Sequence, residues 1–412
     1  MREEQKHRQK KGRQGLPLTA AFLGFLAVFG AGLVFLPEKV FSDTENRYLA
    51  QKPEWTPEAF LDGSYGEDYE KYFSDQFPMR GGLVALKALA QRSAGKGDVN
   101  GVYFGKDGYY IERFDREKLL NGQLQKNIAY LAKAVSSFEE SLGEDHVRVM
   151  LVPSASQILT EKLPDFAESW DQTEVYELLR EAAWRENAAG KGKKGEAQDW
   201  PSWLLRPDQV LAGHSGEELY YRTDHHWTTK GAYYAFSCWM DSIGEKPPDM
   251  EKYDRTVVTE EFLGTIHSKL NIPMNPDRIE VWTPAGAGEW NGDSQFEVFY
   301  DGVPEAHGSL YEPERLKGRD KYAVFLDGNH ALTEIVNTEA AGHRRLLIIK
   351  DSYAHCFAAF AAPYFERVYM ADLRYLNQKL SELSEEEKVT DVLVLYQIPG
   401  FASDENVTKI AR

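Results

Sequence analysis

Cysteine is almost absent from the sequence, which has only Cys238 and Cys356 in 412 residues. Two thiols exclude a scaffold built from disulfides, and they exclude any cysteine-rich zinc or iron–sulfur module. At most one disulfide can form, and the separation of the two residues along the chain does not decide whether they pair.

Positive charge is also scarce. The chain has 48 Lys and Arg against 65 Asp and Glu, a net charge of −17. An acidic chain repels phosphate backbones, so we expect no nucleic-acid partner. With 42% hydrophobic and 27% charged residues the composition is that of a globular protein, and the length is sufficient for a sizeable core.

One long stretch, residues 16–36, carries no charge at all. Its 21 residues would cross a bilayer core of about 30 Å at about 1.5 Å per residue. The preceding tail, residues 1–15, is basic, and the positive-inside rule then predicts a cytoplasmic N-terminus. We therefore predict a single-pass anchor in the cell membrane with residues 37–412 outside the cytoplasm. A cleaved signal peptide is the alternative, although its apolar run is usually shorter.

Short apolar runs typical of buried strands alternate with helical patterns over much of the chain. The strands are predicted at 146–153, 345–349, 367–370 and 391–396, and the helices at 117–142, 352–365 and 377–387. This alternation predicts an α/β fold with a parallel sheet flanked by helices. Residues 245–320 are rich in Pro, Gly and short strand-like pieces and interrupt the alternation, so we predict a β-rich insertion there.

The first candidate for chemistry is the segment that contains Asp224, His225 and His226. In an extended segment, residues two apart point to the same side, so Asp224 and His226 would face together and His225 would face away. A carboxylate beside an imidazole selects the tautomer and stabilises the imidazolium, as a general base requires. With His355, the two histidines could instead bind a metal, but the remaining ligands lack metal-type spacing. We therefore predict neither a metal nor a cofactor.

The second candidate is Ser352, which follows the strand predicted at 345–349 and precedes a helix. A Ser at such a turn lies at the carboxyl edge of the sheet, where open α/β folds bind ligands. Its hydroxyl and backbone N–H suit a nucleophile and an oxyanion donor. The alternative is that Ser352 only caps the helix. Cys356, one turn into the helix, is expected to be buried.

Several strings resemble the bacterial DHHW-motif protein family, related to alginate O-acetyltransferase-like proteins of the SGNH-hydrolase superfamily. They are TDHHW at 223–227, KDSY at 350–353, FSDQFPMR at 73–80 and FLDGNH at 325–330. The resemblance covers residues 40–405. It implies a permuted SGNH-hydrolase-like fold in which Asp224 orients the base His226 and Ser352 is the nucleophile.

The resemblance also bears on the oxyanion hole, for which SGNH enzymes use the Ser N–H, a Gly N–H and an Asn side chain. Here the strand at 391–396 ends in Gln397, whose amide can donate the same bond from a longer side chain. Arg374 is a second candidate because a cation stabilises an oxyanion. Tyr353 and Trp227 complete the predicted oxyanion and substrate-binding set, although a core position is favoured for Trp227 over a sugar-binding one. Asn329 precedes the nucleophile strand and ranks below Gln397.

The resemblance implies an enzyme of the bacterial cell envelope that O-acetylates a cell-surface or secreted polysaccharide through an acyl-enzyme. Its expected partners are the polysaccharide acceptor and a multi-pass membrane acyltransferase that supplies the acetyl groups. With water as the acceptor, the same Ser-His-Asp triad would make a carbohydrate esterase. A further alternative is a non-catalytic glycan-binding component of a polysaccharide export complex.

Overall fold

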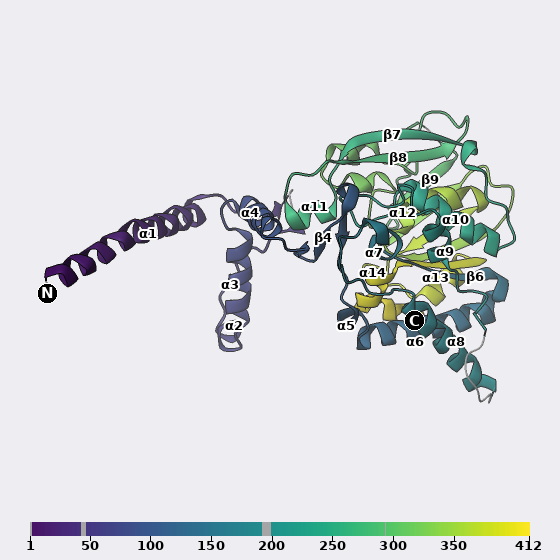
Figure 1. Ribbon diagram of the computed structural model, residues 1–412. Coiled ribbons are helices and arrows are strands. Elements are labelled where there is room, and N and C mark those ends of the chain that lie inside the picture. The colour runs from purple at the N-terminus through teal and green to yellow at the C-terminus, as the bar shows by residue number, and fades with distance from the viewer. Residues whose placement is uncertain (1, 43–46, 192–198, 293) are drawn as a thin grey trace. The chain divides into compact units, whose positions relative to one another are not determined.

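The structure is a computed structural model that describes all residues except 1, 43–46, 192–198 and 293 (Figure 1). It consists of two compact units, one formed by residues 1–93 with 270–272 and the other by residues 94–269 with 273–412. Both predicted sites of chemistry belong to the second unit.

The first unit is mainly helical. Its helices are α1 (Arg2–Phe35), α2 (Pro57–Leu61), α3 (Ser64–Asp75) and α4 (Arg80–Ser93), and β1 (Phe41–Ser42) pairs antiparallel with β2 (Arg47–Tyr48). Thr56 caps α2, since its hydroxyl accepts a hydrogen bond from the backbone N–H of Ala59 at 3.2 Å. The buried carboxylate of Asp75 accepts one from the N–H of Ala50 at 2.9 Å.

The predicted membrane anchor at residues 16–36 lies in α1 except for its last residue. Within the part of the chain that the structure describes, no helix is long and apolar enough to cross a membrane. The prediction of an anchor, and the membrane localisation derived from it, are therefore wrong.

The second unit is built on a six-stranded sheet in the order β6-β13-β11-β12-β10-β9. The strands in that order are β6 (Val147–Val152), β13 (Asp391–Gln397), β11 (Arg345–Lys350), β12 (Arg367–Ala371), β10 (Leu332–Asn337) and β9 (Phe296–Tyr300). The first four are parallel, whereas β10 pairs antiparallel with both β12 and β9. The α/β class is confirmed, but the sheet is mixed rather than parallel. Residues 338–344, between β10 and β11, are too few for the crossover that parallel strands need.

Helices cover both faces of this sheet (Figure 1). On one side lie α6 (Gly122–Leu142), α8 (Glu174–Lys191), α13 (Leu380–Glu386) and α14 (Ile398–Ser403), and on the other α9 (Pro207–Gly213), α10 (Thr229–Ser242) and α12 (Ala354–Ala361). Strand β11 shows the two-residue period, because Leu346 and Ile348 join one core and Leu347 and Ile349 the other. The nucleophile strand is thus buried on both faces.

The remaining elements are short or lie outside the main sheet. They are the sheet of β3 (Asp98–Val99), β4 (Val102–Phe104) and β5 (Tyr110–Glu112), the antiparallel pair β7 (Tyr253–Phe262) and β8 (Asp277–Pro284), and the helices α5 (Arg116–Leu119), α7 (Ala155–Ile158) and α11 (Thr265–Leu270). Residues 245–320, predicted as an insertion, therefore supply the β7–β8 pair and also the edge strand β9. Cys238 and Cys356 are both free thiols.

We predict that Asn127 of α6 is a main contributor to the stability of the second unit. Its buried side-chain amide donates to the carbonyls of Phe401 at 2.7 Å and Asp404 at 2.9 Å. Asn127→Ala would leave both carbonyls unpaired and should cost about 2 to 3 kcal/mol, lowering the urea midpoint of unfolding. Lys126→Ala, an exposed change on the same helix, should stay within about 0.5 kcal/mol of the wild type. Equal midpoints for the two variants would contradict the prediction.

Candidate active site

The segment with the two histidines is a tight loop rather than an extended strand. Tyr220 and Trp227 form an isolated antiparallel bridge across it, and the N–H of Tyr221 donates to the carbonyl of His226 at 3.2 Å. Within the loop, Asp224 Oδ1 accepts the backbone N–H of His226 at 2.9 Å. Asp224 and His226 therefore share a side because the carboxylate closes a turn over two residues, and not because of strand alternation.

The loop and the β11 edge bring the three predicted catalytic residues together. His226 Nδ1 lies 2.5 Å from Asp224 Oδ1, and His226 Nε2 lies 2.7 Å from Ser352 Oγ. Since a carboxylate can only accept, Nδ1 carries the proton and Nε2 is free to accept the Ser352 hydroxyl. Asp224 and His226 are buried, whereas Ser352 is half-buried and reachable. This is the geometry that nucleophile activation requires.

The outer oxygen of Asp224 is held by residues that the sequence did not point to. Asp224 Oδ2 accepts the backbone N–H of Thr265 at 2.8 Å and its hydroxyl at 3.0 Å. Gly264 leaves the necessary space, because a Cβ there would lie 2.2 Å from Asp224 Oδ2. Asp277 anchors the loop through the N–H of Thr223 at 2.8 Å and its hydroxyl at 2.7 Å. All these supports come from the segment predicted to be an insertion, so no motif reveals them.

His225 has a different environment. Its Nδ1 lies 2.7 Å from the hydroxyl of Thr265, and because that hydroxyl donates to Asp224, Nδ1 must donate to it. The His225 ring is partly exposed and packs against the ring of His226, with 3.9 Å between centroids. No contact joins it to Ser352 among the described residues. His225 thus lies beside the triad without belonging to it.

The electrostatics of the pair follow from its burial. Burial opposes the charge of Asp224, but the neighbouring His226 and His225 and the bonds from His226 and Thr265 outweigh it and hold the pKa of Asp224 well below its usual range. For His226, burial is the largest influence and the charge of His225 the second. Together they lower its pKa to about 4 although Asp224 acts to raise it. His226 is therefore neutral at neutral pH, as a base must be.

Ser352 is positioned by the residue before it. Asp351 Oδ1 accepts the N–H of Tyr353 at 2.9 Å, and its Oδ2 accepts the N–H of Gln397 at the end of β13 at 2.8 Å. This carboxylate therefore joins the ends of two parallel strands. The backbone N–H of Ser352 has no hydrogen-bond acceptor among the residues that the structure describes, which leaves it free for an oxyanion.

Three members of the predicted oxyanion and substrate-binding set have other roles. The side-chain amide of Gln397 donates to the hydroxyl of Tyr353 at 2.7 Å, and that hydroxyl donates to the carbonyl of His225. The Trp227 indole N–H donates to the Tyr353 carbonyl at 3.0 Å. All three side chains are buried, so they join the histidine loop to the serine turn and offer no surface to a substrate.

Arg374 and Asn329 lie together at the same sheet edge as Ser352. Arg374 makes two bonds to the buried carboxylate of Asp372, at 2.8 and 2.6 Å, and Arg374 Nη2 donates to Asn329 Oδ1 at 3.0 Å. Asn329 is exposed and reaches this edge because β10, which follows it, runs antiparallel to β12. On the sequence alone, Asn329 ranks below Gln397 as an oxyanion candidate, because the direction of a strand in the sheet cannot be known from the order of residues along the chain.

His355, the third histidine considered as a metal ligand, belongs to a separate buried group. His355 Nε2 lies 2.8 Å from Lys350 Nζ, which is 3.3 Å from Asp372 Oδ2. Asp224, His225 and His226 place potential ligand atoms within 4.8 Å of one another. Both ring nitrogens of His226 are, however, already hydrogen-bonded to Asp224 and Ser352. The ring nitrogens of His226 are therefore used by the triad and are not free to coordinate a metal.

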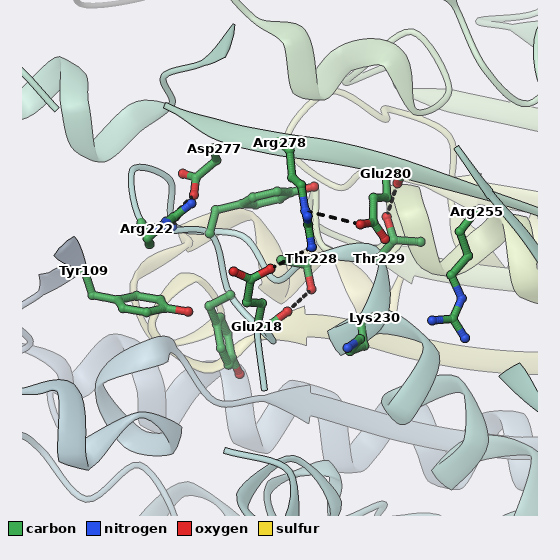
Figure 2. Close-up of a pocket in the computed structure, with 12 residues that line it drawn as sticks. Tyr109, Glu218, Arg222, Thr228, Thr229, Lys230, Arg255, Asp277, Arg278 and Glu280 are labelled. Atoms are coloured by element: carbon green, nitrogen blue, oxygen red, sulfur yellow. Dashed lines mark hydrogen bonds and ion pairs between the residues drawn. The ribbon is translucent and has the colours of Figure 1, made fainter. Parts of the chain in front are cut away.

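A cavity of about 170 Å³ lies behind the histidine loop. It is lined by Tyr109, Glu218, Tyr220, Tyr221, Arg222, Thr228, Thr229, Lys230, Arg255, Asp277, Arg278 and Glu280. Figure 2 shows Arg278 between Glu218 and Glu280, at 3.1 and 3.3 Å. Ser352 does not line this cavity. Ion pairs among the lining residues satisfy much of the charge there. We therefore interpret these residues as structural support behind the histidine loop.

Two family models match parts of this chain. Residues 208–371 match the DHHW protein family, and residues 102–274 match the SGNH hydrolase-like domain of acetyltransferase AlgX. No curated protein matches the chain. The resemblance to the DHHW family and to SGNH hydrolase-like acetyltransferases is therefore confirmed.

Solved structures show the same fold. A DHHW family protein from Eubacterium siraeum is 21% identical with a TM-score of 0.56, over 76% of this chain and 95% of that one. PatB1 of Bacillus cereus is 18% identical with a TM-score of 0.55, over 73% and 97% of the two chains. The structure of Bacillus cereus PatB1 with a sulfonyl adduct is 17% identical with a TM-score of 0.53, over 73% of this chain and 97% of that one.

The two neighbours of His226 act on its pKa with opposite sign, which can be measured. In the wild type the imidazole should titrate with a pKa of about 4. Asp224→Asn removes a negative charge and should lower that pKa, whereas His225→Ala removes a positive one and should raise it. The ring nitrogen signals of His226, followed by NMR from neutral pH downwards, report each value. Shifts of the same sign in both variants would be inconsistent with the contacts described.

Proposed function

Given the match to the DHHW and SGNH hydrolase-like acetyltransferase families, we propose that this protein is an O-acetyltransferase that acts on a polysaccharide. The supporting observation is the continuous chain from Asp224 through His226 to the half-buried Ser352. Such a chain activates a hydroxyl for acyl transfer. The family match supports an acetyl group as cargo and an SGNH-type reaction.

In the first half-reaction, His226 Nε2 accepts the hydroxyl proton as Ser352 Oγ attacks the donor carbonyl. The Ser352 N–H donates to the developing oxyanion. The tetrahedral intermediate collapses, the leaving group takes the proton from His226, and the acetyl group remains as an ester on Ser352. Asp224 stays ionised throughout and stabilises the imidazolium.

In the second half-reaction, an acceptor hydroxyl of the polysaccharide gives its proton to His226 and attacks the acetyl ester. When the intermediate collapses, Ser352 Oγ recovers the proton and the acetylated sugar leaves. The donor is supplied by a separate multi-pass membrane acyltransferase, as the family resemblance implies. Water in place of the sugar would turn the same site into an esterase, so the measured acceptor decides between the two.

The acyl-enzyme provides a direct test. After exposure to an activated acetyl ester, the intact protein should gain one acetyl group on Ser352, detected by mass spectrometry of the peptide that contains it. Ser352→Ala should abolish this gain and lower acetyl transfer about a thousandfold or more. Ser381→Ala, an exposed Ser of α13, is the matched control and should be acetylated like the wild type. A folded Ser352→Ala variant with wild-type transfer would exclude the proposed nucleophile.

The pH dependence of acylation should follow the neutral fraction of His226. Because burial lowers its pKa to about 4, the acylation rate should rise with pH through about 4 and remain level to neutrality. Stopped-flow measurement of leaving-group release from the activated ester gives the profile. His226→Ala should remove the inflection, and its combination with Ser352→Ala should be scarcely slower than either change alone. A wild-type profile that falls as the pH rises from 4 to 7 would argue against His226 as the base.

A further inference from the structure

A cavity of about 470 Å³ lies apart from the triad, between the end of β8, the loop that follows it, and β9. Its most informative lining residues are Trp282, Trp290, Phe296, Tyr311, Glu289 and Glu339. The volume falls in the range of small-molecule binding sites. Nothing in the catalytic geometry uses this cavity.

Aromatic side chains form one wall of the cavity. The half-buried ring of Trp290 meets Tyr311 nearly edge to face, with centroids 6.2 Å apart and an interplanar angle of 67°. Tyr311 is held in turn, because its hydroxyl donates to the carbonyl of Trp282 at 2.8 Å. Trp282 and Phe296 are buried behind them. The ring of Tyr311 that supports Trp290 is therefore held in place before any ligand arrives, which lowers the entropy cost of binding.

The rim of the cavity is polar and acidic. Glu289 and Glu339 are exposed there, and the lining also includes Gln295, Ser309 and Thr338. Among the described residues that line the cavity there is neither Lys nor Arg. A ligand with an apolar face and several hydroxyl or amide groups suits this combination, whereas a carboxylated ligand would be repelled. A pyranose ring without charge has these properties.

Helix α12 relates the cavity to the reaction. Ala359 of α12 lines the cavity, and Ser352 precedes the same helix, about 10 Å away along its axis at about 1.5 Å per residue. The proposed acceptor is a polymer, whose units extend well beyond the one being acetylated. A separate site on the second compact unit of the protein can therefore hold sugars of that polymer other than the one being acetylated.

We propose that this cavity binds uncharged pyranose units of the acceptor polysaccharide, with Trp290 as the stacking platform. The role in acceptor binding rests on the proposed function, but the binding of an uncharged glycan does not. The cavity would hold the polymer close to the acyl-enzyme and raise its local concentration there.

The binding test uses the full chain with Ser352→Ala, titrated by calorimetry with four tetrasaccharides. Tetra-N-acetylchitotetraose, cellotetraose and mannotetraose are uncharged, and tetragalacturonic acid is anionic. At least one uncharged tetramer should bind, and Trp290→Ala should weaken it about tenfold or more, as should Ala287→Trp, which fills the cavity from its exposed loop. Trp55→Ala, at an exposed Trp of the first unit, should leave binding unchanged.

The proposal is overturned if no uncharged tetramer binds, if tetragalacturonic acid binds more tightly, or if neither cavity variant weakens binding while both fold as judged by circular dichroism. A second, kinetic experiment uses the chain that keeps Ser352. Trp290→Ala should raise KM for the bound tetramer as acceptor and leave acylation by the small activated ester unchanged. Glycan binding that Trp290→Ala weakens, together with no acetylation of Ser352 in the chain that keeps this residue, would instead refute the proposed function and leave the binding site standing.

Discussion

The two hydrogen bonds of the His226 ring are the interaction on which the site depends. Asp224 accepts a hydrogen bond from the Nδ1–H of His226, which keeps the proton on Nδ1 and leaves Nε2 as an acceptor directed at Ser352. The carboxylate of Asp224 and the imidazole of His226 are both buried. A buried polar group without a hydrogen-bond partner would cost several kcal/mol, so the surrounding contacts must keep the two side chains aligned. Thr265 satisfies the second carboxylate oxygen, and Gly264 provides space that any side chain would occupy.

A second layer of buried groups connects the two halves of the site. Residues 224–227 and 351–353 are far apart in the chain, and Tyr353 joins them by bonding to Gln397, His225 and Trp227 at once. Loss of any one of these bonds would leave a buried donor or acceptor without a partner. Side chains that look suited to substrate binding therefore serve to keep the nucleophile and the base at a fixed distance.

The prediction of the membrane anchor shows one limit of reading composition. Charge and length along residues 16–36 favoured a spanning helix, yet no helix among the described residues has the length and apolar character that crossing a membrane requires. The sheet shows another limit. The buried strands were visible as apolar runs, but the reversed direction of β10 depends on a short connection and on which neighbour it pairs with. That reversal is also what carries Asn329 to the edge that holds Ser352.

The sequence by itself determined the α/β class, the strands that lead to Ser352, and Asp224, His226 and Ser352 as candidates, because strand and turn signals and short motifs are local. Only the tertiary structure decided that Thr265 and Asp277 support the loop and that Gln397 bonds to Tyr353. Contacts of this kind join residues that are distant along the chain, and no local pattern encodes them. Their partners are selected by burial, because each polar group removed from water must find a donor or acceptor nearby.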